Sequence, residues 1–249
     1  GLDSPFLERL ERWLYAHHPK YWIDVVEPKK TDILYRNLDE DKRILLESYR
    51  RTSGVMNYVR LINGAFSTKP TSEWEEPDPI PWQAIMGREG NIYKTYDEFM
   101  DAEGHRDWSS IAVYFYRDEW IMGDIEYQQA LFEEIYKHQY NPIIFYGQYG
   151  SNPRVGIPNM KLSMNYLFGK DVFPFDVLIN TCKFSFQSLG AQTLEELKLQ
   201  GVPIVQGYTI YMDEKSWAEN PQGVTPLDVN LSISQPELDG VIQGGVVAF

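Results

Sequence analysis

Hydrophobic residues follow two different spacings along the chain, and the change between them lies near residue 105. Before it, apolar positions recur at helical spacing, first over residues 6–14 and again over 39–62. Ser4 and Pro5 precede the first run, and Ser before a helix with Pro in its first turn is a start signal. We therefore predict a helix near the N-terminus and a second one from about 39 to 62, with Gly54 as a point of interruption.

Residues 67–90 lack either period and are rich in Pro, Trp and Glu. Large aromatic residues are wasteful in a disordered linker, so we predict an ordered but irregular connector. A short helix over 95–102 follows. This first part, residues 1–105, is predicted to be a helical segment with a Pro/Trp-rich connector.

From Trp108 onward, short apolar runs alternate with amphipathic stretches. Strands are predicted at 111–116, 142–146, 176–180 and 203–206, and helices at 124–138, 158–168 and 193–200. A continuous apolar run such as IAVYFY is typical of a strand buried on both faces. The alternating order indicates an α/β domain over 106–249, with a flavodoxin-like, open, mostly parallel sheet flanked by helices.

The C-terminal residues change pattern once more. Apolar and polar residues alternate over 229–234, which predicts a half-exposed strand. A turn over 235–240 and a second strand through Val246 and Val247 follow. The chain stops at Phe249 within that strand, so we expect a fragment that runs into the start of a following domain.

Charge and motifs exclude several function classes. The net charge of −13 and the absence of a dense basic run argue against nucleic-acid binding. No apolar run is long enough to cross a bilayer, and neither GxGxxG nor GxxxxGK[ST] occurs. Cys182 has no Cys or His neighbour, and we interpret it as a buried thiol.

In an open α/β sheet, ligands gather beyond the carboxyl ends of the strands. The residues selected there as ligand-binding are Arg117, Thr181, Phe184, Ser185 and Gln206. Glu237 and Asp239, spaced by two on a turn bounded by Pro and Gly, are suited to binding a divalent cation or accepting protons. The competing interpretation is a solvated acidic turn.

The C-terminal half resembles the large, tetrapyrrole-binding subunit of the cobalt and magnesium chelatases. The resemblance lies in GVPIVQ (201–206), the following Trp217, GVTPLD (223–228) and QPELDG (235–240). The Tyr116-Arg117 pair with Gly123 and the loop 181–186 also resemble that family. It covers about 106–249, and PELDG is its most specific motif.

This resemblance implies a role in ATP-dependent insertion of a divalent metal, cobalt or magnesium, into a tetrapyrrole. Both the metal and the macrocycle would be substrates, and ATP would be used by a partner AAA+ subunit that acts with an adaptor. The resemblance further implies catalytic roles for Glu237 and Asp239, with Glu237 also a metal ligand, and adds Trp217 to the ligand-binding set. A cytoplasmic location is expected, or the cell envelope if a targeting signal is removed.

The family's large subunit is several times longer than this chain, so we expect the fragment to be inactive alone. Two alternatives stay open. A paralogue of the same family would remove metal from haem during iron acquisition. A non-catalytic flavodoxin-like module would use the same edge of the sheet for a small ligand or a partner protein.

Overall fold

A computed structural model describes residues 39–148, 157–169, 172–183, 185–210, 212–221 and 223–248. The chain divides into two compact units, 1–80 and 81–249. This boundary lies earlier than the predicted one near residue 105. The helix predicted over 6–14 lies outside the described residues.

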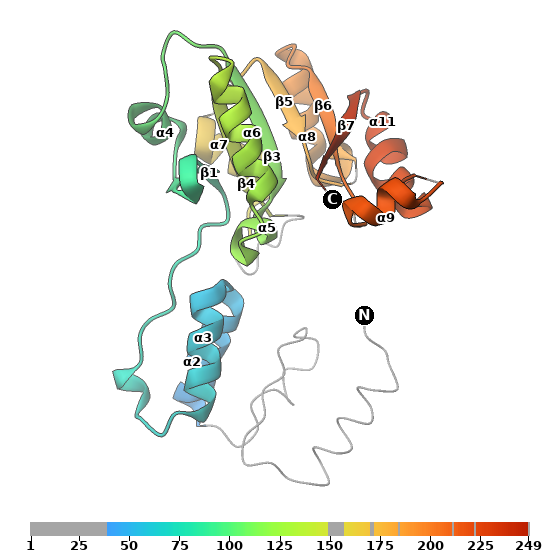
Figure 1. The fold of residues 1–249 in the computed structure, drawn as a ribbon. Helices are drawn as coiled ribbons and strands as arrows, with labels where there is room; N and C mark the ends of the chain where they lie inside the picture. Colours follow the sequence, from blue (N-terminus) through green and yellow to red (C-terminus); the bar gives the residue numbers. More distant parts are fainter. Residues whose placement is uncertain are drawn as a thin grey trace. The chain divides into compact units, whose positions relative to one another are not determined.

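The first unit contains an interrupted pair of helices (Figure 1), α2 (Glu40–Thr52) and α3 (Val55–Phe66), followed by a single 3₁₀ turn, η2 (Thr71–Glu73). The predicted interruption at Gly54 is confirmed. Gly54 has φ 90°, a backbone conformation that strains any residue with a side chain, so glycine is favoured at this point. A small core of Leu46, Tyr49 and Leu61 holds the two helices together.

The second unit is built on a seven-stranded sheet. Its spatial order is β2 (Ile92–Tyr93), β1 (Ala84–Met86), β4 (Asn141–Gly147), β3 (Ser110–Tyr116), β5 (Val177–Asn180), β6 (Ile204–Thr209) and β7 (Ile242–Ala248). Strands β4, β3, β5, β6 and β7 are parallel to one another, whereas β1 pairs antiparallel with β4 and with β2. The predicted α/β class with a mostly parallel sheet flanked by helices is confirmed.

Helices connect and flank these strands. They are α4 (Tyr96–Ala102), α5 (Arg117–Met122), α6 (Glu126–Lys137), α7 (Met160–Phe168), α8 (Phe186–Leu199) and α9 (Glu214–Glu219), with a 3₁₀ turn η3 (Arg88–Gly90) between β1 and β2. In Figure 1, α6 lies in front of the sheet and α7 lies behind it. The central strands are almost fully buried between these layers: the side chains of Val113, Phe115, Ile144 and Tyr146 are 0% exposed.

The strand predicted at 229–234 is wrong. This stretch is a π-helix, η5 (Val229–Ser234), between two single helical turns, α10 (Pro226–Asp228) and α11 (Gln235–Glu237). Thr225 starts the run, because its Oγ1 accepts the Asp228 N–H at 3.1 Å. The buried face consists of Asp228, Ser232, Pro236 and Asp239, which recur at helical spacing.

The physical reason for this error is that polar residues occupy the interior here. Val229, which the alternating pattern would have buried, is 37% exposed, whereas Ser232, which it would have exposed, is 2% exposed. The second predicted strand is confirmed as β7, which adds to the sheet parallel to β6.

Candidate functional site

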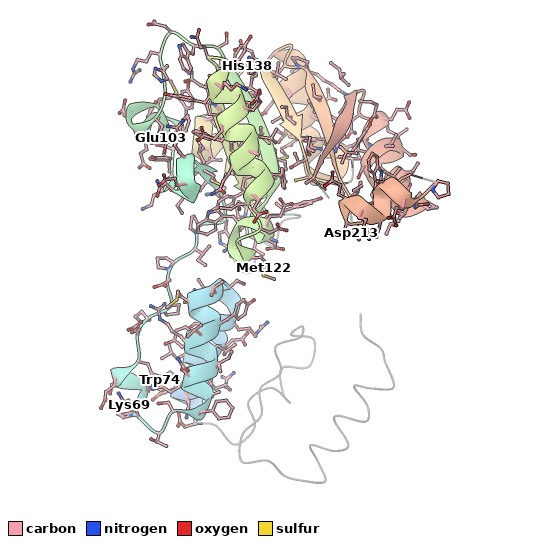
Figure 2. All side chains as sticks on the ribbon, in the orientation of Figure 1. Lys69, Trp74, Glu103, Met122, His138 and Asp213 are labelled. Carbon is pink, nitrogen blue, oxygen red and sulfur yellow. The ribbon has the colours of Figure 1, made fainter. Side chains whose placement is uncertain are left out.

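The topological switch point of the sheet lies at the carboxyl ends of β3 and β5. The chain passes from β3 to β4 on one side of β3 and then crosses to β5 on the other side. Connections therefore leave these two strands in opposite directions, which opens a crevice where ligands bind in folds of this kind. Figure 2 marks this carboxyl edge by Met122, at the end of α5, and the opposite edge by His138. We call the carboxyl-edge groups described below the rim.

Glu119 is an acidic residue of the rim with an unusual environment. It lies on α5, the short helix that directly follows β3. Its Oε2 accepts hydrogen bonds from Tyr127 Oη at 2.6 Å and from Gln128 Nε2 at 2.5 Å, both on α6. Burial raises the pKa of the Glu119 carboxyl to about 7, against the lowering effect of the Tyr127 and Gln128 bonds, with Asp124 raising it further.

Tyr127 connects Glu119 to the loop after β5. Its Oη lies 2.9 Å from Thr181 Oγ1, and Thr181 Oγ1 donates to the Tyr114 carbonyl oxygen at 3.0 Å. Burial raises the Tyr127 pKa well above its usual range, and the neighbouring Glu119 charge adds to this effect. Two strand ends are thus joined through three side chains.

A buried ion pair ties the same loop to the helical run after α9. Lys183 Nζ lies 3.1 Å from Asp228 Oδ1, and the two side chains are 5% and 2% exposed. Burial raises the Asp228 pKa, but hydrogen bonds from Thr225 and Lys183 outweigh burial and lower it overall. Burial also lowers the Lys183 pKa, more than the attraction of Asp228 raises it.

Asp239 lies at the N-terminus of α8. Its Oδ1 accepts the Ser185 hydroxyl at 2.7 Å, and its Oδ2 accepts the Phe186 N–H. Ser185 is also the N-cap of α8, since its Oγ accepts the Gln187 N–H at 3.0 Å. The carboxylate of Asp239 therefore occupies the position where a helix N-terminus attracts an anion.

The amide of Gln206, within β6, is fully buried. Its Nε2 donates to the Cys182 carbonyl at 3.0 Å, and its Oε1 accepts from Asn180 Nδ2 at 2.8 Å. Cys182 is buried, as predicted, and burial raises the pKa of its thiol well above the usual range. This part of the rim is a closed network that fixes the backbone of the loop after β5.

The structure brings together four of the predicted site residues: Thr181, Ser185, Gln206 and Asp239 all surround the loop after β5. The others lie elsewhere. Arg117 is buried at the start of α5, where its Nε donates to the Pro81 carbonyl at 2.9 Å and its guanidinium covers the Trp82 ring. Trp217 is half-buried on α9, and Glu237 is exposed. Phe184 lies outside the described residues.

Glu119 and Lys183 also follow predicted strands, but they were not among the residues selected from the sequence, and neither were Tyr127 and Asp228. One signal was available for Tyr127. It lies eight positions after Glu119, on the next helix, and on the side of that helix that faces the sheet. No sequence pattern pairs Lys183 with Asp228, because 45 positions separate them.

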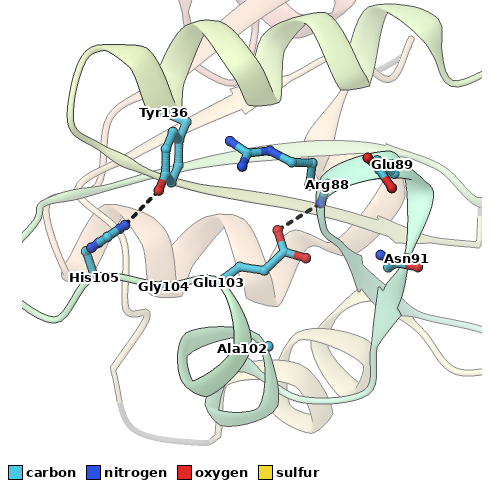
Figure 3. Close-up of a pocket in the computed structure, with 8 residues that line it drawn as sticks. All are labelled: Arg88, Glu89, Asn91, Ala102, Glu103, Gly104, His105 and Tyr136. Carbon is cyan, nitrogen blue, oxygen red and sulfur yellow. Dashed lines mark hydrogen bonds between the residues drawn. The ribbon is translucent and has the colours of Figure 1, made fainter.

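A separate pocket lies at the other edge of the sheet (Figure 3). Its volume is about 480 Å³, and Arg88, Glu103, His105 and Tyr136 line it. Glu103 accepts the Arg88 N–H and the Tyr93 hydroxyl, and the latter bond raises the Tyr93 pKa to about 12. Arg88 is stacked over Tyr136 and paired with Glu133, while His105 bonds Tyr136, so these side chains are already engaged with one another.

No helix among the described residues is long and apolar enough to cross a membrane. No group of three or more His, Cys, Asp and Glu side chains is placed in that part of the chain to hold a metal ion.

Known proteins match most of the chain. A family model described as CobN/Magnesium Chelatase matches residues 47–249. The uncharacterized protein MJ0908 of Methanocaldococcus jannaschii is 30% identical over 221 residues, which is 83% of this chain and 18% of that protein. The aerobic cobaltochelatase subunit CobN of Pseudomonas aeruginosa is 22% identical over 71% of this chain and 13% of its own length.

A solved structure agrees with the fold. The catalytic subunit of cobaltochelatase from Mycobacterium tuberculosis superposes with a TM-score of 0.57 at 19% identity, over 83% of this chain and 17% of that one. The chain spans less than a fifth of the length of each of these relatives. Because the family model covers residues 47–249 of 249, the chain belongs to the CobN/magnesium chelatase family.

Proposed function

We propose that this chain is a segment of the tetrapyrrole-binding large subunit of an ATP-dependent metal chelatase. The match of the family model over residues 47–249 is the observation that carries the proposal. Cobalt insertion into a corrinoid precursor is the favoured reaction, because two of the relatives are named as cobaltochelatase subunits. Magnesium insertion into protoporphyrin is the second form of the same reaction.

Metal insertion replaces two pyrrole N–H protons by one divalent cation. The protein must therefore hold a flat ring, accept two protons and remove water from the metal ion. The rim offers hydrogen-bonding side chains at the switch point, and the exposed carboxylate of Glu237 is suited to the first encounter with a hydrated cation. We assign Glu237 the metal-binding role, and Thr181, Ser185, Gln206 and Trp217 supporting roles around the ring.

Asp239 has a different place in this proposal. Its two oxygens face Ser185 Oγ and the Phe186 N–H, so its contribution is to hold the loop after β5 against α8. Arg117 likewise supports the rim, through the Pro81 carbonyl and the Trp82 ring. Both are positioning residues.

ATP hydrolysis is assigned to partner subunits, an AAA+ ATPase and its adaptor. The sequence contains neither GxGxxG nor GxxxxGK[ST], and the Asp239 carboxylate occupies the N-terminus of α8, where a phosphate would be attracted. We further propose a cytoplasmic location, and no insertion activity for the chain alone.

The test is a tryptophan-fluorescence quenching titration with a corrinoid precursor, protoporphyrin and haem, made on the full-length parent and on this chain. Tight binding of one metal-free ring by the parent supports insertion and identifies the substrate. Selective binding of haem would replace insertion by metal removal. No binding of any ring would overturn the proposal and favour a non-catalytic module.

A further inference from the structure

The carboxyl group of Glu119 is the first member of a linear chain of hydrogen-bonding groups. Tyr127 Oη lies 2.6 Å from Glu119 Oε2 and 2.9 Å from Thr181 Oγ1. Thr181 Oγ1 in turn lies 3.0 Å from the Tyr114 carbonyl oxygen, where the chain ends. Three contacts therefore connect the carboxyl group to a backbone acceptor.

The number of protons in this chain depends on the charge of Glu119. When Glu119 is neutral, three protons serve three contacts: Glu119 donates to Tyr127, Tyr127 to Thr181, and Thr181 to the Tyr114 carbonyl. When Glu119 is ionised, Tyr127 donates to Glu119, and the Thr181 hydroxyl turns to donate to Tyr127. The Tyr114 carbonyl keeps a donor in both states, because the Thr181 N–H also bonds it at 3.0 Å.

Both protonation states of Glu119 are therefore satisfied, and only hydroxyl rotations separate them. A side chain that changes charge in a partly buried place normally leaves an orphaned donor or acceptor in one of its states. The hydroxyl chain removes that cost. It is the feature expected around a carboxyl group that takes up and releases a proton as part of its function.

The charged and titratable neighbours tune this group. Burial first, and then Asp124, raise the Glu119 pKa, whereas the bonds from Tyr127 and Gln128 lower it. Lys183 and Cys182, on the loop after β5, also interact with the Glu119 charge. The balance brings the group near neutral pH, where a carboxyl group is most effective in proton transfer.

The missing partner of this cluster is a hydrogen-bond donor. Gln128 is fully buried, and its Oε1 has no donor among the described residues. Both side-chain bonds to Glu119 reach Oε2, and a backbone hydrogen bond from Tyr116 also reaches the carboxyl group, so the acceptor left without a donor in the described part of the chain is the Gln128 amide oxygen beside it. An amide oxygen and a carboxylate are both acceptors, so the chemistry that fits beside them is an N–H group.

We propose that Glu119 is the proton-accepting residue of the rim and binds an N–H donor ligand in its carboxylate form. This rests on the proposed function, since a metal-free tetrapyrrole supplies pyrrole N–H groups. The pyrrole N–H bond breaks, an O–H bond forms on Glu119, and the electron pair stays on the ring nitrogen for the metal. Glu119, which is only partly buried, then returns the proton to water.

The test measures the Kd of metal-free protoporphyrin for this chain from pH 6 to pH 8. If the ring binds only to the carboxylate form, and Glu119 titrates at about 7, the Kd should be about tenfold higher at pH 6 than at pH 8. Glu119→Gln should remove this pH dependence. Tyr127→Phe should move the midpoint to higher pH, because the lost hydrogen bond favours the charged form of Glu119.

Asp118→Asn is the matched control. Asp118 is the exposed neighbour of Glu119 on α5, and its substitution should leave the profile unchanged. If the Kd of the wild-type chain and that of Glu119→Gln depend on pH in the same way, the inference is overturned but the proposed function is not. An unmoved midpoint in Tyr127→Phe overturns it as well, even where Glu119→Gln does not fold. Binding by the parent but not by this chain overturns the inference alone, and no binding by either overturns both.

Discussion

The buried Lys183–Asp228 pair offers the sharpest test of the packing at the rim. Lys183→Met removes the ammonium group and leaves Asp228, 2% exposed, with the Thr225 hydroxyl at 2.7 Å as its remaining side-chain donor. Breaking a buried pair from one side costs about 3–5 kcal/mol, because the other charge stays uncompensated. For a protein of this size that corresponds to a fall in Tm of roughly 6–20 °C.

The assay is urea unfolding of wild type, Lys183→Met, Asp228→Asn and the double variant, followed by tryptophan fluorescence. The double variant should lose less unfolding free energy than the two single variants together, because neither charge is left without its partner. Arg106→Met, which removes a pair with Asp101 whose side chains are 79% and 70% exposed, is the control and should leave the urea midpoint unchanged.

The pH dependence gives a second readout of the same pair. Hydrogen bonds from Thr225 and Lys183 lower the Asp228 pKa in the wild type, so its stabilising contribution is lost as pH falls through that lowered pKa. In Lys183→Met, burial dominates and Asp228 takes up a proton at higher pH. The difference in unfolding free energy between the wild type and Lys183→Met should therefore become smaller as the pH falls. A loss below about 1 kcal/mol at pH 7 would refute the interpretation of a buried, paired charge.

Three further results are expected. Asp239→Ala removes the acceptor for Ser185 Oγ and the Phe186 N–H, and should lower the free energy of unfolding by about 1–2 kcal/mol in urea titrations; an unchanged midpoint would contradict the capping role. Since burial raises the Glu119 pKa from 4.5 to about 7, its native state binds the extra proton and stability falls as pH rises through that window; Glu119→Gln should therefore be more stable than wild type at pH 8, relative to pH 5, by urea midpoints. Glu237→Gln should leave Tm unchanged, because the side chain is exposed, while metal insertion by the full-length parent falls; unchanged insertion would remove Glu237 from the proposed mechanism.

The central sheet was predictable because its strands are continuous apolar runs. β3 and β4 are buried on both faces, and no helical period competes with that pattern. β1 and β2 were not predictable, since strands of three and two residues carry no periodic signal. They form because β1 pairs antiparallel with the exposed edge of β4, a long-range contact that local sequence does not encode.

The helical run 226–237 shows a different limit. Together with Asp239 just beyond it, its buried face holds two carboxylates, a serine and a proline, and no count of apolar positions would place these inside. What makes them stable there is a set of distant partners: Lys183 for Asp228, and Ser185 with Phe186 for Asp239. The local signal that did favour a helix, Thr225 before Pro226, was outweighed by the alternation of Val229, Leu231 and Ile233.

For the candidate site, sequence placed polar residues after the right strands but not the pairs they form. Thr181, Ser185 and Gln206 were predicted because each follows a strand, and parallel strands end at one edge. Which acid meets which donor depends on the side to which each loop turns. From the segment after β3, Arg117 was selected and Glu119 was not, because the contact with Tyr127 that distinguishes Glu119 is made only in the folded structure.

The two acids predicted to act together, Glu237 and Asp239, are separated by the fold into different environments. Asp239 is buried with both oxygens engaged, so it cannot also offer them to a cation at the surface. Glu237 is exposed and hydrated, as suits a first contact with a hydrated metal ion, and its charge raises the pKa of the nearby Tyr208, after the larger effect of burial there. Accepting a proton from a ring needs a partly buried carboxyl group whose pKa lies near neutral pH, and Glu119 is such a group. The two tasks of a chelatase therefore fall to two different carboxylates, and loss of one should spare the other: Glu237→Gln should keep the pH profile of ring binding, and Glu119→Gln should remove it.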